Sequence, residues 1–265
     1  MGKLSKAQEE AQRRKYMAEL RQKERQAAKK MSRIVWLISI VSAIVIVAVV
    51  SSVLVLTYLR DKAGQAPKME DLNFTALSSA EYDKLVLTPN DPSDLVSIKV
   101  SYTAADGESK SGNIVVRLFE EVAPQTVANF KKLVSSNHYA ASEFHRVLKG
   151  FMIQGGDSVS GAGAKSIKGE FSENGFKNNL SHKRGVISMA RGDEPNSASD
   201  EFFIVHQDTT ELDGKYAAFG YVVYGMDIVD EIAALEVEAN PKMDGEVSRP
   251  VDKVSITSVN FVNFR

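Results

Sequence analysis

The chain of 265 residues contains no cysteine and only one tryptophan. Without cysteine, the protein has no disulfide framework, no thiolate metal site, no cysteine nucleophile and no lipidated cysteine anchor. Seven prolines and seventeen glycines are too few for a collagen-like or proline-rich chain. What is present, 43% hydrophobic and 25% charged residues, is the composition of a chain that folds around a packed core.

The longest hydrophobic segment runs from Ile34 to Leu59 and contains 26 residues without a charge. A helix of that length spans about 39 Å, more than the roughly 30 Å hydrocarbon core of a bilayer. Trp36 and Tyr58 lie near its two ends, where aromatic side chains favour the membrane interface. A cleaved signal peptide is the alternative, but its apolar region usually has only about 7–15 residues. We therefore expect a single transmembrane helix at residues 34–59.

Charge is distributed unevenly along the chain, although the formal net charge is only −1. Residues 1–33 carry eleven Lys or Arg and four Glu, whereas only Arg60 and Lys62 closely follow the span. Because positive residues stay on the cytoplasmic side, we expect a cell-membrane protein oriented N-in and C-out, with its main domain extracytoplasmic. Residues 1–33 are expected to form a cytoplasmic basic helix. Its role stays open between attraction to anionic lipid and a purely topological signal.

Residues 60–95 are expected to be a linker, because residues that break helices and strands recur through them. These residues include Asp61, Gly64, Pro67, Pro89 and Pro92. Several apolar residues of this linker could dock on the neighbouring domain: Phe74, Leu77, Tyr82, Leu85, Val86 and Leu87.

From residue 96 onward the hydrophobic pattern has a period of two, which indicates a mainly β domain at residues 96–265. Short strands are expected at 96–102, 113–119, 143–148, 151–155, 185–190, 202–206, 217–223 and 253–261. Helical patterns begin at Pro124 and cover 226–235. Many strands with only two helices favour an antiparallel β barrel or sandwich over a doubly wound sheet.

Apparent motifs for other chemistries fail on their spacing. The segment Gly161–Ser166 suggests a phosphate-binding loop, but Val159 and Ala164 stand where that loop needs glycine. Gly156 and Ser158 lack the G-x-S-x-G pattern of a serine hydrolase. The four histidines show no metal-ligand spacing. We therefore expect no metal, no cofactor and no nucleic-acid partner.

Three segments carry a specific pattern: FHRVLKGFMIQGGD at 144–157, GVISMARGDEPNSASDEFF at 185–203 and LDGKYAAFG at 212–220. In this order they resemble the cyclophilin-type peptidyl-prolyl cis-trans isomerases, over about residues 96 to 264. The segment IKGEF at 167–171 is most similar to bacterial members. The resemblance implies an eight-stranded antiparallel β-barrel capped by two helices, with its site on an outer face of the barrel.

The resemblance also implies the roles of individual residues. Arg146 matches the catalytic arginine, and Gln154 matches a residue that binds substrate backbone and orients that arginine. Glu201 stands where many members have glutamine, and we expect it among the substrate-binding residues. Its carboxylate near the pocket could pair with Arg146 or Arg191 and alter the choice of substrate.

The substrate-binding residues follow from the same resemblance. Those that match the proline pocket are Phe151, Met152, Phe203 and Leu212. Ala190 and Arg191 match the strand edge that pairs with substrate backbone, and Tyr216 matches a position at the pocket rim.

The chemistry of proline isomerisation needs few groups. Rotation about the X-Pro bond has a barrier of about 18–20 kcal/mol, because it breaks amide resonance. An apolar pocket that grips the ring and a donor to the amide suffice, and Arg146 is charged at any physiological pH. We expect a monomeric peptidyl-prolyl isomerase that acts on proline-containing polypeptides and assists folding. The alternative is a non-catalytic, membrane-tethered chaperone or scaffold that binds proline peptides in the same groove.

Overall fold

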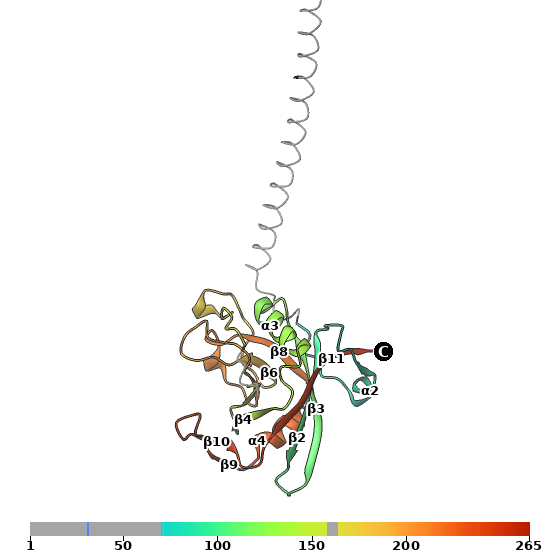
Figure 1. Cartoon of the computed structure of the whole chain (residues 1–265), viewed down its shortest axis with the longest axis vertical. Coiled ribbons are helices and arrows are strands. Elements are labelled where there is room, and N and C mark those ends of the chain that lie inside the picture. The colour runs from blue at the N-terminus through green and yellow to red at the C-terminus, as the bar shows by residue number, and fades with distance from the viewer. Residues whose placement is uncertain (1–30, 32–69, 71, 158–163) are drawn as a thin grey trace, which may run out of the picture. The chain divides into compact units, whose positions relative to one another are not determined.

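The computed structural model describes residues 31, 70, 72–157 and 164–265, and the chain divides into two units at Lys62 and Ala63. The basic helix predicted for 1–33 lies outside the described residues except at Met31, and the membrane span predicted for 34–59 lies wholly outside them. Among the described residues, no helix is both long and apolar enough to span a bilayer. The folded domain of the second unit carries the colours from cyan to red in Figure 1.

Eight antiparallel strands of this domain close into a barrel (Figure 1). They are β2 (Leu95–Thr103), β3 (Ser109–Leu118), β4 (Ser142–Leu148), β5 (Met152–Gly155), β6 (Val186–Met189), β7 (Phe202–Val205), β8 (Ala218–Tyr224) and β11 (Ser255–Phe264). The order is β11-β2-β3-β8-β6-β7-β5-β4, and pairing of β4 with β11 closes the ring. The predicted mainly β, eight-stranded antiparallel barrel is confirmed, and each strand overlaps a predicted one.

Two longer helices each bury one face against the barrel. They are α3 (Pro124–Ser135) and α4 (Met226–Ala233), which Figure 1 shows toward opposite ends of the barrel. Helix α3 buries Phe130 completely, and α4 buries Ile232 completely. Both were expected from their helical periodicity, and the side chains they bury join the main core inside the barrel.

A second, smaller core lies on the outer face of the barrel. Because side chains alternate along a strand, Val115 and Val223 face away from the lumen, yet both are almost fully buried. Residues Leu77, Tyr82 and Leu85 cover them. The N-terminal segment therefore covers this part of the outer face.

The residues that cover this outer core come from the second half of the predicted linker. The structure corrects the linker prediction there, because these residues are ordered against the barrel. Residues 72–95 contain α2 (Ser79–Tyr82) and β1 (Leu85–Leu87), and β1 pairs with β11 as a ninth strand outside the ring. The docking expected for Phe74, Leu77, Tyr82 and Leu85 is confirmed, whereas Leu87, expected to dock with them, is exposed.

Four further short elements were not predicted. Strands β9 (Val237–Ala239) and β10 (Val247–Pro250) form a separate two-stranded sheet. Single 3₁₀ turns occur at η2 (Ser172–Asn174) and η3 (Thr210–Leu212). The β9–β10 hairpin and η3 both border the site described next.

Candidate active site

One pocket of about 210 Å³ collects nine of the ten residues that the sequence assigned to the site. They are Arg146, Phe151, Met152, Gln154, Ala190, Arg191, Phe203, Leu212 and Tyr216, and Met243 joins them. Glu201 is the tenth predicted residue; it does not line this pocket, but its carboxylate is hydrogen-bonded to Gln154. Segments far apart in the sequence thus meet at one place on the barrel.

Strand register explains why these side chains meet. Arg146 on β4 pairs with Gln154 on β5, and Gln154 pairs with Phe203 on β7. Directly opposed residues of neighbouring strands place their side chains on the same face. The three side chains therefore form a row across the outer face of the barrel.

A bulge in β4 puts Arg146 on that face. Phe144 is buried in the main core, and strict alternation would direct the residue two positions later into the core as well. The register between β4 and β5 shifts between Phe144 and Arg146, so His145 is the extra residue. Such a bulge re-aims the side chains that follow it, so Arg146 faces outward while Val147 returns to the core.

The floor of the pocket is apolar and rigidly supported. Met152 and Phe203 are almost fully buried, and the ring of Tyr216 meets the Phe203 ring edge-on at 5.7 Å between centroids. Behind Phe203, the His182 ring stacks at 5.9 Å. An apolar floor with fixed ring positions suits a proline ring, because the ring carries no N–H or O–H that needs a partner.

Hydrogen bonds to the partly exposed Asp213 and the buried Ser188 hold His182 in place. Its Nδ1 lies 2.8 Å from Asp213 Oδ1 and its Nε2 lies 3.0 Å from Ser188 Oγ. Burial lowers the pKa of His182, although the hydrogen bond to Asp213 opposes this effect. The order acid, imidazole and hydroxyl is that of a hydrolase triad, but Ser188 is completely buried. This chain of hydrogen bonds therefore supports the pocket floor and offers no accessible nucleophile.

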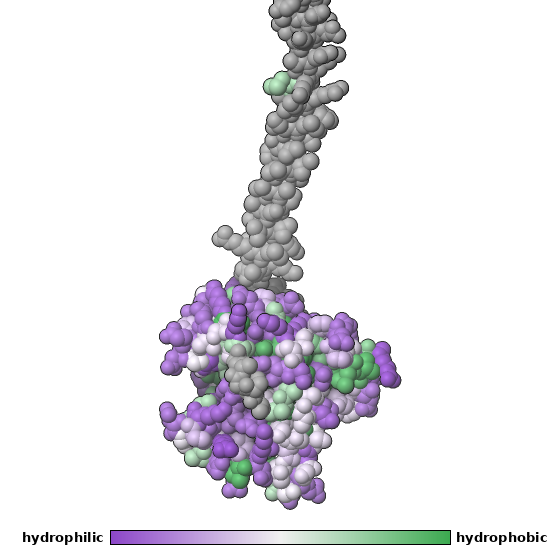
Figure 2. Space-filling view, viewed as in Figure 1, coloured by the Kyte–Doolittle hydropathy of each residue, from purple (hydrophilic) through white to green (hydrophobic). Residues whose placement is uncertain are grey.

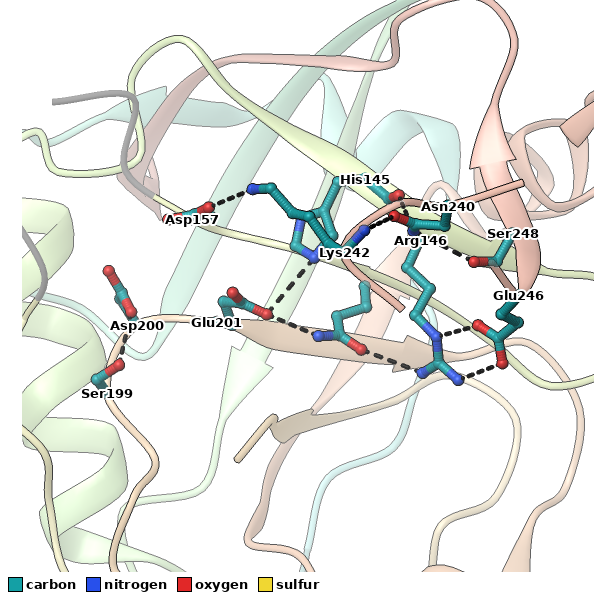
Figure 3. Close-up of polar contacts among 11 residues, drawn as sticks. His145, Arg146, Asp157, Ser199, Asp200, Glu201, Asn240, Lys242, Glu246 and Ser248 are labelled. Atoms are coloured by element: carbon teal, nitrogen blue, oxygen red, sulfur yellow. Dashed lines mark hydrogen bonds and ion pairs between the residues drawn. The ribbon is translucent and has the colours of Figure 1, made fainter. Parts of the chain in front are cut away.

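Arg146 is held from two sides (Figure 3). Its Nε and Nη2 donate to the two carboxylate oxygens of Glu246, at 2.6 and 2.9 Å, and its Nη1 donates to Gln154 Oε1 at 3.3 Å. The hydrogen bonds from Arg146 hold the pKa of Glu246 below its usual value, against the opposing effect of partial burial. The Arg146 side chain keeps 20% of its surface exposed, which leaves it open to a bound substrate.

Glu201 forms an ion pair with neither Arg146 nor Arg191, so the pairing considered from the sequence is not present. Its Oε2 accepts a hydrogen bond from Gln154 Nε2 at 2.7 Å and lies 3.5 Å from His145 Nε2 (Figure 3). The carboxylate fixes the amide of Gln154, whose oxygen then faces Arg146. Glu201 thus acts on the site through Gln154.

Arg191 forms one side wall of the pocket. Its guanidinium lies 4.8 Å from the Tyr216 ring centroid and 5.2 Å from that of Phe171. Its Nε donates to the Lys215 carbonyl at 2.9 Å. The N–H of Ala190 donates to the Glu201 carbonyl, so a substrate backbone at this edge must use other groups.

Two residues at the site were missed by sequence reasoning. Met243 lines the pocket, and Glu246 pairs with Arg146 from a position 100 residues later in the chain. Both belong to the hairpin between β9 and β10, and neither lies in one of the three motif segments. An isolated glutamate in a charged loop carries no sequence signal, because most such residues are solvated surface groups.

An apolar pocket with an arginine donor at its rim, on the outside of a closed barrel, offers the two groups that rotation about a bond to proline needs, a seat for the ring and a donor to the amide. Comparisons with known proteins agree. The family described as "Cyclophilin type peptidyl-prolyl cis-trans isomerase/CLD" matches residues 103–261. Peptidyl-prolyl cis-trans isomerase B of Saccharomyces cerevisiae is 38% identical over 157 residues, which cover 56% of this chain and 76% of that protein.

Two further relatives come from distant organisms. Peptidyl-prolyl cis-trans isomerase-like 3 of Gallus gallus is 39% identical over 150 residues, covering 56% of this chain and 89% of that protein. A peptidyl-prolyl cis-trans isomerase of Acinetobacter baylyi is 35% identical over 159 residues, covering 58% and 84%. The chain belongs to the cyclophilin-type peptidyl-prolyl cis-trans isomerases, and it catalyses that reaction.

The geometry is compatible with a mechanism without covalent chemistry, in which Arg146 is the donor that the family resemblance implies. As the amide twists, its nitrogen becomes pyramidal and accepts a hydrogen bond, so a donor that meets it only then favours the transition state. A guanidinium has five N–H groups, and Glu246 and Gln154 accept from three of those of Arg146. The remaining two can serve the substrate. One charge-assisted hydrogen bond contributes about 1.5–3 kcal/mol, or roughly 10–150-fold in rate.

Proposed function

We propose that this isomerase is anchored by a single helix in the cytoplasmic membrane of a bacterium and acts on X-Pro bonds of extracytoplasmic proteins, whose folding it assists. The observation that carries the proposal is the uncharged run Ile34–Leu59 and the charges on its two sides. Eleven Lys or Arg precede the run, and only two, Arg60 and Lys62, closely follow it. The run is long enough to cross a bilayer, and the charge asymmetry favours an extracytoplasmic domain.

The chemistry of the site supports a protein substrate. The pocket lies on the outer surface of the barrel and is lined by Arg146, Phe151 and other groups that serve a single proline and its neighbouring amide. A shallow surface site of this kind accepts any flexible chain that presents a proline. Tethering such a site to the membrane would raise its effective concentration for chains emerging there.

Protease accessibility in a bacterial host tests the anchoring. Protease added to spheroplasts that express the full-length chain should digest the isomerase domain and spare residues 1–33. The double variant Val45→Asp and Val49→Asp should release the protein from the membrane, because each central aspartate costs about 2.5–3.5 kcal/mol on insertion. The matched control, Gln12→Asp with Gln22→Asp, should leave the protein in the membrane. A protected domain, or a double variant that stays membrane-bound, would refute the proposal.

The folding role needs a separate measurement. Added to a refolding protein whose slow phase is proline-limited, the full-length chain should accelerate that phase. The Arg146→Ala variant should not. Equal acceleration by both proteins would indicate that binding alone, the chaperone alternative, is responsible.

A further inference from the structure

The β9–β10 hairpin, residues 237–250, is fastened to the strand that carries the catalytic arginine. Asn240 is almost fully buried, and its Nδ2 donates to the His145 carbonyl at 3.1 Å and to Ser248 Oγ at 3.3 Å (Figure 3). His145 is the bulge residue directly before Arg146. The hairpin is therefore attached to β4 at His145, the residue before Arg146, whose side chain the hairpin also contacts.

The turn of the hairpin has a defined conformation. Asp244 and Gly245 both adopt left-handed backbone angles, with φ of 50° and 82°. The N–H of Gly245 donates to the Asn240 carbonyl at 3.0 Å, and the N–H of Asn240 donates to the Glu246 carbonyl at 2.7 Å. These bonds close the turn, so Met243 and Glu246 emerge from it at fixed positions beside the pocket.

The ion pair fixes the plane of the guanidinium. Glu246 takes the edge formed by Nε and Nη2, while Gln154 takes one N–H of Nη1. A bidentate pair of this kind sets direction as well as distance. Three of the five N–H groups of Arg146 are thus hydrogen-bonded within the protein. The two that remain for a substrate are one on Nη1 and one on Nη2. An arginine without this restraint would lose more rotamer freedom when it meets the twisted amide.

We propose that Glu246 is a positioning residue for the isomerase reaction: through its bidentate bond it holds the Arg146 guanidinium in the orientation that meets the transition state. Glu246 acts through Arg146 and does not contact the substrate. The inference rests on the isomerase activity and is independent of the membrane anchor. It also assigns a function to a hairpin that lies outside the three motif segments.

Kinetics of the full-length chain test this role, with kcat and KM measured separately on a proline tetrapeptide. Glu246→Ala should lower kcat about tenfold while KM stays within about twofold, because the lost effect belongs to the transition state. Glu246→Gln keeps one acceptor oxygen and the shape of the side chain, so its kcat should lie between those of the wild type and Glu246→Ala. The matched control is Glu238→Ala. Glu238 is on the same hairpin, faces Arg249 at 3.9 Å and is exposed, so both constants should stay unchanged.

A spectroscopic readout separates positioning from general damage. The ¹⁵N–¹H signal of Arg146 Nε should be protected from solvent exchange in the wild type and in Glu238→Ala, and exposed to exchange in Glu246→Ala. If the hairpin loses its structure in Glu246→Ala, the same exchange and kinetic measurements on Glu246→Gln test the positioning role instead. An exchange-exposed Nε with unchanged or raised kcat would overturn the proposal, as would a rise in KM alone. A wild-type chain without turnover would instead contradict the isomerase activity itself.

Discussion

At the scale of single residues, the site is a chain of hydrogen bonds with a carboxylate at each end. Glu246 holds Arg146, Arg146 contacts Gln154, and Gln154 in turn donates to Glu201 (Figure 3). Next to Glu201, His145 has a buried Nδ1 without a hydrogen-bond partner among the described residues. The charge of Arg146 is thus paired with that of Glu246 before any substrate arrives.

Replacing the arginine should remove catalysis and leave the fold. Arg146→Ala should lower kcat/KM at least about tenfold, because the charge-assisted hydrogen bond to the twisted amide is lost. Arg146→Lys should recover only part of the loss, since a point-charge ammonium cannot make the bidentate bond to Glu246. The tetrapeptide isomerisation assay, with circular dichroism as a check of folding, measures both effects. Near wild-type turnover in the alanine variant would refute the assigned role.

The buried histidine behind the pocket should make stability depend on pH. Burial lowers the pKa of His182, so the unfolded chain, whose histidines titrate near 6.5, binds more protons below that pH than the folded chain does. Stability should therefore be constant above about pH 7.5 and should fall as pH drops through 6.5. His206, whose pKa burial also lowers, should add to this slope.

Urea unfolding at pH 5.5, 6.5 and 7.5 measures the slope. His182→Gln cannot take up a proton in this range and should show a shallower slope than the wild type, with a residual part due to His206. Identical slopes in the two proteins would mean that His182 remains readily protonated in the folded state.

At the scale of elements, the start of α3 depends on a distant side chain. Ala123 at the N-cap position has no side-chain oxygen, and Pro124 follows it. The buried Glu170 instead accepts from the N–H of Gln125 at 3.0 Å and from the N–H and Oγ1 of Thr126, both at 2.8 Å. A carboxylate at a helix N-terminus also interacts favourably with the helix dipole.

Removal of this cap should destabilise the whole domain. Glu170→Ala leaves two backbone N–H groups and one buried hydroxyl without their partner, at about 1–3 kcal/mol for each unsatisfied group. We expect a loss of at least about 2 kcal/mol in the free energy of unfolding. Glu173, exposed on η2 close by, provides the matched control, and Glu173→Ala should change stability by less than about 0.5 kcal/mol. Equal stability of the two variants would contradict the capping role.

The elements also show where sequence reasoning stops. Both longer helices and the longer barrel strands were predictable, because each buries one regular face and so leaves a period in the sequence. Strands β5, β6 and β7 have four residues each, all buried, so they show as short, largely apolar runs without a period. Strands β1, β9 and β10 have three or four residues, most of them at least partly exposed, so neither a period nor a buried apolar run marks them in the sequence. The bulge at His145 has no sequence signature, so the outward position of Arg146 came from the family resemblance and not from alternation. Glu246 could not be identified from the sequence, because it meets Arg146 only when the hairpin is folded.

At the scale of the whole domain, the fold includes an N-terminal segment in addition to the eight-stranded barrel. The segment 72–87 seals the outer core, and its Tyr82 ring stacks on Tyr224 at 4.0 Å between centroids. Figure 2 shows apolar surface in green beside α2 and the C-terminus, and Leu87 and Phe264 are exposed hydrophobic residues of the paired strands there. This side of the barrel depends on residues that precede the region matched by the family.

Truncation should therefore separate stability from catalysis. A fragment of residues 96–265 loses Leu77, Tyr82 and Leu85, and it exposes the outer core to water. Relative to residues 72–265 we expect it to lose on the order of 3 kcal/mol of unfolding free energy, or about 10 °C in Tm. Its kcat/KM should stay within about twofold, because the pocket is built on other strands and loops and none of its lining residues comes from the removed segment.

Calorimetry and the tetrapeptide assay on the two fragments measure these effects side by side. Tyr82→Ala within residues 72–265 serves as an intermediate, since it removes the stacked ring but keeps the backbone pairing of β1 with β11. Its Tm should lie between those of the two fragments. Equal Tm values for the fragments would show that the outer core contributes nothing to stability. A large loss of turnover in the shorter fragment would show that this core supports the pocket across the barrel.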